Sequence, residues 1–166
     1  MVRSLLKDCR AAAAAEMALV LPLLLLIMFS SIELGNYFMN EHKLVEAVRN
    51  GARFAARQSF SNYTACSGAP DGTVVSDTRN VVMNGYLSGG TVITPNIQAA
   101  DIDVSTSCIS VAGGETMTGI YVGRPGGAQK VTVAASVNYR PVISAVGFTG
   151  IGFKLNAKSE AAVSGS

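Results

Sequence analysis

Cysteines, carboxylates and one histidine are the side chains of this 166-residue chain whose types could do chemistry. His42 has no second histidine, cysteine or acid at the spacing of a metal site, so we predict that it is a surface residue. Asp101 and Asp103 lie two residues apart, but two acids do not make a calcium loop. Nucleophile-elbow and phosphate-loop patterns are absent. We therefore predict that the protein is not an enzyme and has no catalytic, cofactor-binding or metal site.

The three cysteines are better suited to structure than to catalysis. Cys66 and Cys108 both follow a long apolar segment, and we expect that segment to place them outside the cytoplasm. Thiols in an oxidising compartment usually pair, so we predict a Cys66–Cys108 disulfide, with two separate thiols as the alternative. Cys9 precedes the apolar segment and would stay on the cytoplasmic side.

The apolar segment that would position these groups runs from Ala11 to Phe38. Its centre, residues 17–32, carries no charge, and an acid stands at each edge, Glu16 and Glu33. About 20 helical residues cross a bilayer, so the segment predicts a transmembrane helix reaching to about residue 38. The basic residues that precede it are Arg3, Lys7 and Arg10. Because positive residues stay inside, they place the N-terminus in the cytoplasm and the rest of the chain outside. A cleaved secretory signal is the alternative, but its apolar region is usually shorter.

Glu16 and Pro22 are the unusual residues of this helix. Glu16 is either a carboxylate exposed to water at the cytoplasmic interface or one placed for pairing, because acids in membrane helices are costly and usually paired. Pro22 removes a backbone donor and should bend the helix locally, which favours packing against other protein.

Three blocks in this region resemble the TadE-like (TadE/TadG) pseudopilins of tight-adherence, or Flp-type, pilus systems. The first is RAAAAAEMALVLPLL at residues 10–24, the second is IELG at 32–35, and the third is NGARFAA at 50–56. The signature positions that the resemblance gives are Pro22, Glu33, Gly35, Gly51 and Arg53.

The resemblance implies a specific biogenesis. A prepilin peptidase would cut between Ala11 and Ala12, which would make Glu16 the fifth residue of the mature chain and let it pair with the N-terminal amine of a neighbouring subunit. Family members usually have Gly at the position of Ala11 and an aromatic residue at that of Met17. The implied partners are the membrane, other pilin or pseudopilin subunits, the pilus assembly platform and the peptidase. The implied location is the inner membrane, and the pilus or cell surface after assembly.

Beyond the membrane the helix becomes amphipathic and should continue to about Gln58. Apolar residues recur at helical spacing on one face: Leu44, Val48, Ala52 and Ala55. A basic stripe lies beside it and consists of Arg49, Arg53 and Arg57. It is either a solvated face or a surface for anionic lipid or an acidic partner. Gly51 is costly inside a helix and would allow the close approach of another element.

The remainder predicts a small α+β domain. Asp71 should cap a helix that runs to Tyr86 and is stopped by Gly89-Gly90. Alternating residues predict strands starting near Ile102, Lys130 and Phe153 that form an antiparallel sheet packed on the long helix. An apolar patch in the last connection is either core or a subunit contact: Val142, Ile143, Val146, Phe148 and Ile151.

The predicted organisation is a pilin-like α+β fold in three parts. Residues 1–11 form a cytoplasmic leader, 12–58 the long N-terminal helix, and 59–166 the extracytoplasmic α+β domain. We predict a minor pilin or pseudopilin that enters or assists a tight-adherence pilus through its apolar helix. The alternative is a permanently membrane-anchored envelope binding module. The net charge of +2 does not favour nucleic acid as a partner.

Overall fold

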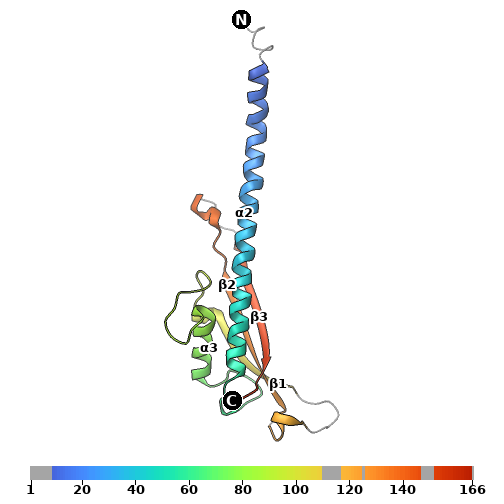
Figure 1. Cartoon of the computed structure of the whole chain (residues 1–166), viewed down its shortest axis with the longest axis vertical. Helices are drawn as coiled ribbons and strands as arrows, with labels where there is room; N and C mark the ends of the chain where they lie inside the picture. The colour runs from blue at the N-terminus through green and yellow to red at the C-terminus, as the bar shows by residue number, and fades with distance from the viewer. Residues whose placement is uncertain (1–8, 110–116, 125, 147–151, 166) are drawn as a thin grey trace. The chain divides into compact units, whose positions relative to one another are not determined.

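The computed structural model describes residues 9–109, 117–124, 126–146 and 152–165. It confirms an α+β arrangement with a long apolar N-terminal helix and a three-stranded antiparallel sheet (Figure 1). The helices and strands are α2 (Cys9–Ala56), α3 (Gly72–Asn84), β1 (Ile102–Ile109), β2 (Ala128–Asn138) and β3 (Lys154–Ala162). Short 3-10 helices are η1 (Phe60–Asn62), η2 (Ala99–Asp101), η3 (Gly119–Tyr121) and η4 (Val142–Val146).

The chain divides into two compact units. The first comprises Met1–Tyr37 and Pro141–Thr149, and the second comprises Phe38–Arg140 and Gly150–Ser166. The helix α2 contributes its N-terminal part to the first unit and its C-terminal part to the second. The sheet and α3 lie wholly in the second unit.

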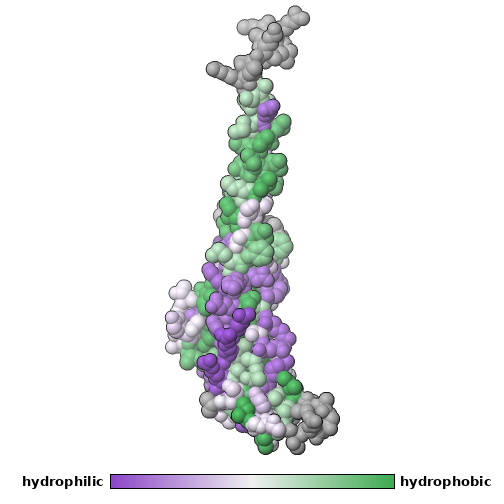
Figure 2. Space-filling model, turned by 45° about the vertical axis from the view of Figure 1, so that its right-hand side comes forward, coloured by the Kyte–Doolittle hydropathy of each residue, from purple (hydrophilic) through white to green (hydrophobic). Residues whose placement is uncertain are grey.

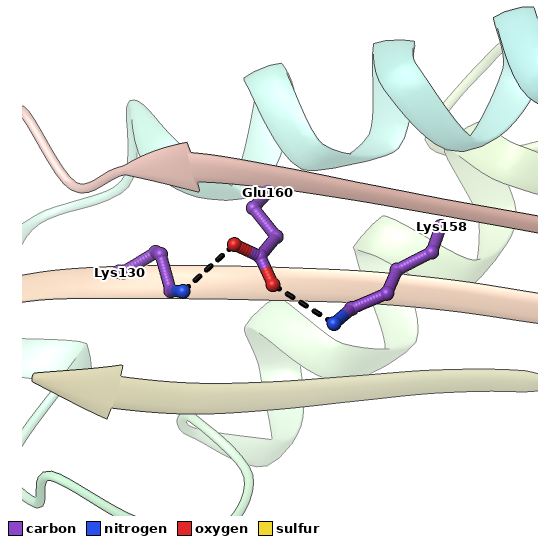
Figure 3. Close-up of polar contacts among 3 residues, drawn as sticks. All are labelled: Lys130, Lys158 and Glu160. Carbon is purple, nitrogen blue, oxygen red and sulfur yellow. Dashed lines mark hydrogen bonds and ion pairs between the residues drawn. The ribbon is translucent and has the colours of Figure 1, made fainter.

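The sheet of the second unit has the order β1-β2-β3, with Val104 opposite Val133 and Val133 opposite Ser159. Side chains on adjacent residues of a strand point to opposite faces, and the burial pattern of β2 alternates accordingly. The buried face of the sheet is lined by small and aliphatic residues: Ile102, Val104, Val131, Val133, Ala135, Val137, Leu155 and Ala157. The C-terminal part of α2 and α3 lie on the same side of the strands (Figure 3).

The C-terminal part of α2 buries the face that its sequence spacing predicted. Leu44, Val48, Ala52 and Ala55 are all fully buried. Gly51 allows α3 to approach closely, because a Cβ at that position would overlap the side chain of Val82. The helix α3 is therefore the element whose close approach the sequence predicted.

The helix α3 begins where the sequence predicted but ends earlier. Asp71 is its N-cap, and its carboxylate accepts a hydrogen bond from the Thr73 backbone N–H at 2.9 Å. The predicted stop at Gly89-Gly90 is wrong. Gly85 ends the helix in the left-handed conformation with φ of 77°, which a glycine adopts without steric cost.

The disulfide between Cys66 and Cys108 is present and joins the loop after α2 to β1, as the sequence predicted. The same loop covers the outer edge of β1, since the Thr106 backbone N–H donates to the Gly68 carbonyl at 2.7 Å. An edge strand covered in this way cannot pair with another chain at that position.

The C-terminal end of α2 is tied to the last residues of the chain. The Ala56 carbonyl accepts a hydrogen bond from the Ser164 backbone N–H at 2.8 Å. Tyr63 donates its hydroxyl to the Ala55 carbonyl, and its burial raises the pKa of the phenol to about 12. These bonds satisfy carbonyls at the helix C-terminus that have no partner within the helix.

The face of the sheet away from the helices is polar. Lys130 and Lys158 both pair with Glu160, at 2.7 and 2.9 Å, and the three side chains lie on the side of the strands opposite the helices (Figure 3). Hydrogen bonds from Lys130 and then Lys158 lower the pKa of the Glu160 carboxyl to about 2. Charged pairs on β3 also discourage edge-to-edge association of this sheet.

Candidate functional site

The N-terminal part of α2 is the candidate site. Every side chain from Ala12 to Ile32 is exposed, including large ones such as Leu19, which is 80% exposed. Hydrophobic side chains cover the visible face of this part of the helix (Figure 2). Of the described helices, this one is long and apolar enough to cross a membrane, and none of its apolar window is buried. A helix that is apolar all round needs an apolar environment.

The polar side chains within the apolar segment are satisfied by the helix itself. Ser30 donates its hydroxyl to the Leu26 carbonyl at 2.7 Å, and Ser31 donates to the Ile27 carbonyl at 2.8 Å. This i to i−4 bonding removes the cost of placing a free hydroxyl in lipid. The segment from Met17 to Ile32 therefore presents a continuous apolar surface.

Pro22 lies inside the helix without ending it. Because proline has no backbone N–H, the carbonyl of Ala18 loses its usual partner four residues on. In a membrane such a carbonyl is tolerated when a neighbouring helix or a local adjustment satisfies it.

The acids at the two edges of the segment have different surroundings. Glu16 is exposed, next to Met17, which is 60% exposed. Glu33 is half-buried, and its two carboxylate oxygens accept hydrogen bonds from the Val142 and Ile143 backbone N–H groups at 3.3 and 3.1 Å. These donors begin η4, in the connection between β2 and β3. The sequence indicated Glu33 as a signature position but did not predict this contact.

The remaining predicted positions are spread along α2. Ala12 is exposed, and Gly35 has no atom near the position a Cβ would occupy. Gly51 is buried against α3, while Arg53 is exposed on the basic stripe with Arg49. The Ala11 side chain lies outside the described residues. Of the apolar patch predicted in the last connection, Phe148, Ile151 and the side chain of Val146 also lie outside them.

The second unit offers little that resembles an active site. No group of three or more potential metal-ligating side chains occurs among the residues that the structure describes. Asp101 accepts a hydrogen bond from the Gln98 backbone N–H at 2.8 Å and so caps η2. A shallow depression beside it includes Asp103 and Lys158, but its walls are largely alanine and other small side chains.

A protein-family model matches most of the long N-terminal helix. Residues 11–53 match the family described as TadE-like protein. The match includes Glu16, Pro22 and Glu33 and confirms the resemblance over this segment. No curated protein and no solved structure matches the chain. The match covers 43 of the 166 residues, about a quarter of the chain.

Proposed function

From the TadE-like segment at residues 11–53, we propose that this protein is a minor pilin or pseudopilin of a tight-adherence pilus. It enters the filament, or assists its assembly, through the apolar N-terminal part of α2. Its partners are the membrane before assembly and the helices of other pilin subunits afterwards. It is held in the inner membrane with its N-terminus in the cytoplasm and its second unit outside.

The observation that carries this proposal is the exposed apolar surface of α2 between Ala12 and Ile32. Burying a large aliphatic side chain is worth about 1.5–3 kcal/mol relative to leaving it in water. A segment with many such side chains, none of them buried by the residues that the structure describes, is stable only in lipid or against other apolar helices. The helix is therefore stable in lipid before assembly and against the helices of other subunits afterwards.

Glu16 supplies the specificity that an apolar surface lacks. A carboxylate near the start of such a helix is expensive in a packed bundle unless a cation faces it. Processing by the prepilin peptidase between Ala11 and Ala12 creates that cation, the free amine of a neighbouring subunit. The pair then sets the register between adjacent helices, and Met17 packs beside it.

Replacement of Glu16 by alanine tests this role. We expect Glu16→Ala to reduce incorporation into sheared filaments strongly while leaving the amount in the membrane unchanged. Glu46→Ala, which removes an exposed acid from the second unit's part of the same helix, is the matched control and should incorporate normally. Normal incorporation of Glu16→Ala would remove the assignment of Glu16.

The N-terminus of the purified protein separates the proposal from its rival, a permanently anchored envelope binding module. A chain that begins at Ala12 has been processed like a pilin. A chain that retains Met1 after pilus assembly has begun favours the anchored module.

A further inference from the structure

The contact between Glu33 and η4 fixes one point of the β2–β3 connection on α2. Both carboxylate oxygens are used, with the Val142 N–H at 3.3 Å and the Ile143 N–H at 3.1 Å. The first N–H groups of a helical turn have no partner within it, and a carboxylate there also interacts favourably with the peptide dipoles. Both partners belong to the first unit, so the contact holds this connection beside the apolar helix.

The position of Glu33 along the helix gives the depth of this contact. The sixteen uncharged residues from Met17 to Ile32 rise about 24 Å, which spans most of the hydrocarbon core of a bilayer. Glu33 follows directly, at the outer boundary of that core. Because Val142 and Ile143 bind its carboxylate, η4 begins at the same depth.

The chemistry of the connection suits that depth. The sequence from Pro141 to Gly152 contains no charged residue. Val142 is 50% exposed and Ile143 is half-buried. An uncharged apolar stretch can lie in a membrane interface without burying a charged side chain.

We propose that residues 141–146 form an interfacial element that contacts lipid at the outer surface of the bilayer and is held there by Glu33. This proposal rests on the membrane placement in the proposed function. The lipid surface is the occupant because Val142 and the two neighbours of Glu33 in the helix, Ile32 and Leu34, all have exposed apolar side chains. Glu33 is a positioning residue: it orients η4 and spares two backbone N–H groups from meeting lipid unpaired.

Tryptophan provides a probe without background, because the chain has none. The interface probe is full-length Val142→Trp, reconstituted in vesicles of phosphatidylethanolamine and phosphatidylglycerol whose acyl chains carry bromine at a shallow or a deep position. The depth marker, Leu24→Trp, reports on the membrane centre. The aqueous control, Tyr86→Trp, lies on the second unit. Both reference side chains are exposed, at 57% and 67%.

The proposal predicts that bromine quenches the interface probe, more strongly from shallow than from deep positions, and that its emission is blue-shifted relative to the aqueous control. The depth marker should be quenched more strongly by deep bromines, and the aqueous control should respond to acrylamide alone. A quenched depth marker with an unquenched interface probe would overturn the interfacial element while keeping the anchor. An unquenched depth marker would overturn the membrane placement and this proposal with it.

A second copy of the chain is the other occupant that the experiment distinguishes. Contact with a second copy would also shift the emission of the interface probe to the blue. That shift would disappear as the protein is diluted in lipid, and bromine would not quench the probe. This result would overturn the lipid contact.

The positioning role of Glu33 is tested in the same background. Glu33→Ala combined with Val142→Trp should lose most of the preference for shallow bromines, and Glu33→Gln should keep part of it because the amide retains one acceptor oxygen. Glu46→Ala combined with Val142→Trp is the control and should behave like Val142→Trp. An unchanged quenching profile in Glu33→Ala would remove Glu33 from the proposal.

Discussion

The two parts of α2 make one continuous helix but depend on different surroundings. From Ala12 to Ile32 every side chain is exposed, and most are apolar. From Leu44 to Ala56 a face of small and aliphatic residues is buried in the second unit. Among the described residues, the chain supplies packing partners for one face of the helix from Leu44 to Ala56 and buries no side chain from Ala12 to Ile32.

Two glycines of α2 show the same difference at single positions. Around Gly35 no atom approaches the place of a Cβ, whereas at Gly51 a Cβ would overlap Val82 of α3. Both glycines lie in the TadE-like segment. Of these two positions, only Gly51 is required to be a glycine by packing against the described residues.

Removal of the disulfide is the largest expected perturbation of the packed part. The bridge closes a loop with a sequence separation of 42, so Cys66→Ser together with Cys108→Ser should lower the free energy of unfolding of the second unit by about 4 kcal/mol. Guanidinium titration of the detergent-solubilised protein, followed by near-ultraviolet circular dichroism of tyrosine, measures the loss. Cys9→Ser is the control, and an equal loss in that variant would contradict the account.

The two glycines allow a direct test of the comparison. We expect Gly51→Ala to destabilise the second unit by about 1–2 kcal/mol, because overpacking against Val82 exceeds the gain in helix propensity. Gly35→Ala should leave that transition unchanged. The double variant of Gly51→Ala with Val82→Ala should recover part of the loss in the same guanidinium titration. Equal effects of the two single glycine variants would remove the distinction between the two parts of the helix.

The cap of α3 gives a smaller, pH-dependent effect. Hydrogen bonds from the Thr73 hydroxyl and backbone N–H lower the pKa of Asp71 below its ordinary value of 3.8. A lowered pKa means that the stabilisation is complete above pH 3.8 and is lost as the pH falls through the folded-state value. Asp71→Ala should destabilise α3 at neutral pH and flatten the acid limb of a thermal melting series. Asp71→Asn, which can still cap, should retain more stability at neutral pH.

The smallest effect is expected at the polar face of the sheet. Glu160 is exposed, so its pairs with Lys130 and Lys158 are screened by water and salt despite their short distances. Glu160→Gln should change the melting temperature at neutral pH only slightly. Because the pKa is about 2 against an ordinary 4.5, the difference from the parent should fade as the pH drops between these values. A large difference that persists in high salt would show that these pairs are not surface interactions.

Local sequence signals were sufficient for much of the second unit. The alternation of apolar and polar residues predicted β1 and β2, and Asp71 as an N-cap predicted the start of α3. The expected location of Cys66 and Cys108 in the same oxidising compartment predicted their disulfide. The end of α3 was missed because Tyr86 fits the helical spacing. The side chain of Tyr86 is 67% exposed, so its helical spacing does not reflect burial against the core. The helix ends before it, at Gly85.

The contact of Glu33 with η4 could not be predicted in the same way. Val142 and Ile143 are 109 and 110 residues away from Glu33 in the sequence. They meet it only because the β2–β3 connection returns to the helix. The sequence showed an acid after an apolar run and an apolar connection after Pro141. Nothing local links the two, since long-range pairing depends on the path of the whole chain.

The direct test of the central claim is the composition of purified filaments. Tight-adherence pili sheared from cells and analysed by quantitative mass spectrometry should contain this protein at a low ratio to the major subunit, with Ala12 as its first residue. Its absence from filaments, together with an unprocessed N-terminus at Met1 in the membrane fraction, would contradict the proposal that the exposed apolar helix is an assembly surface.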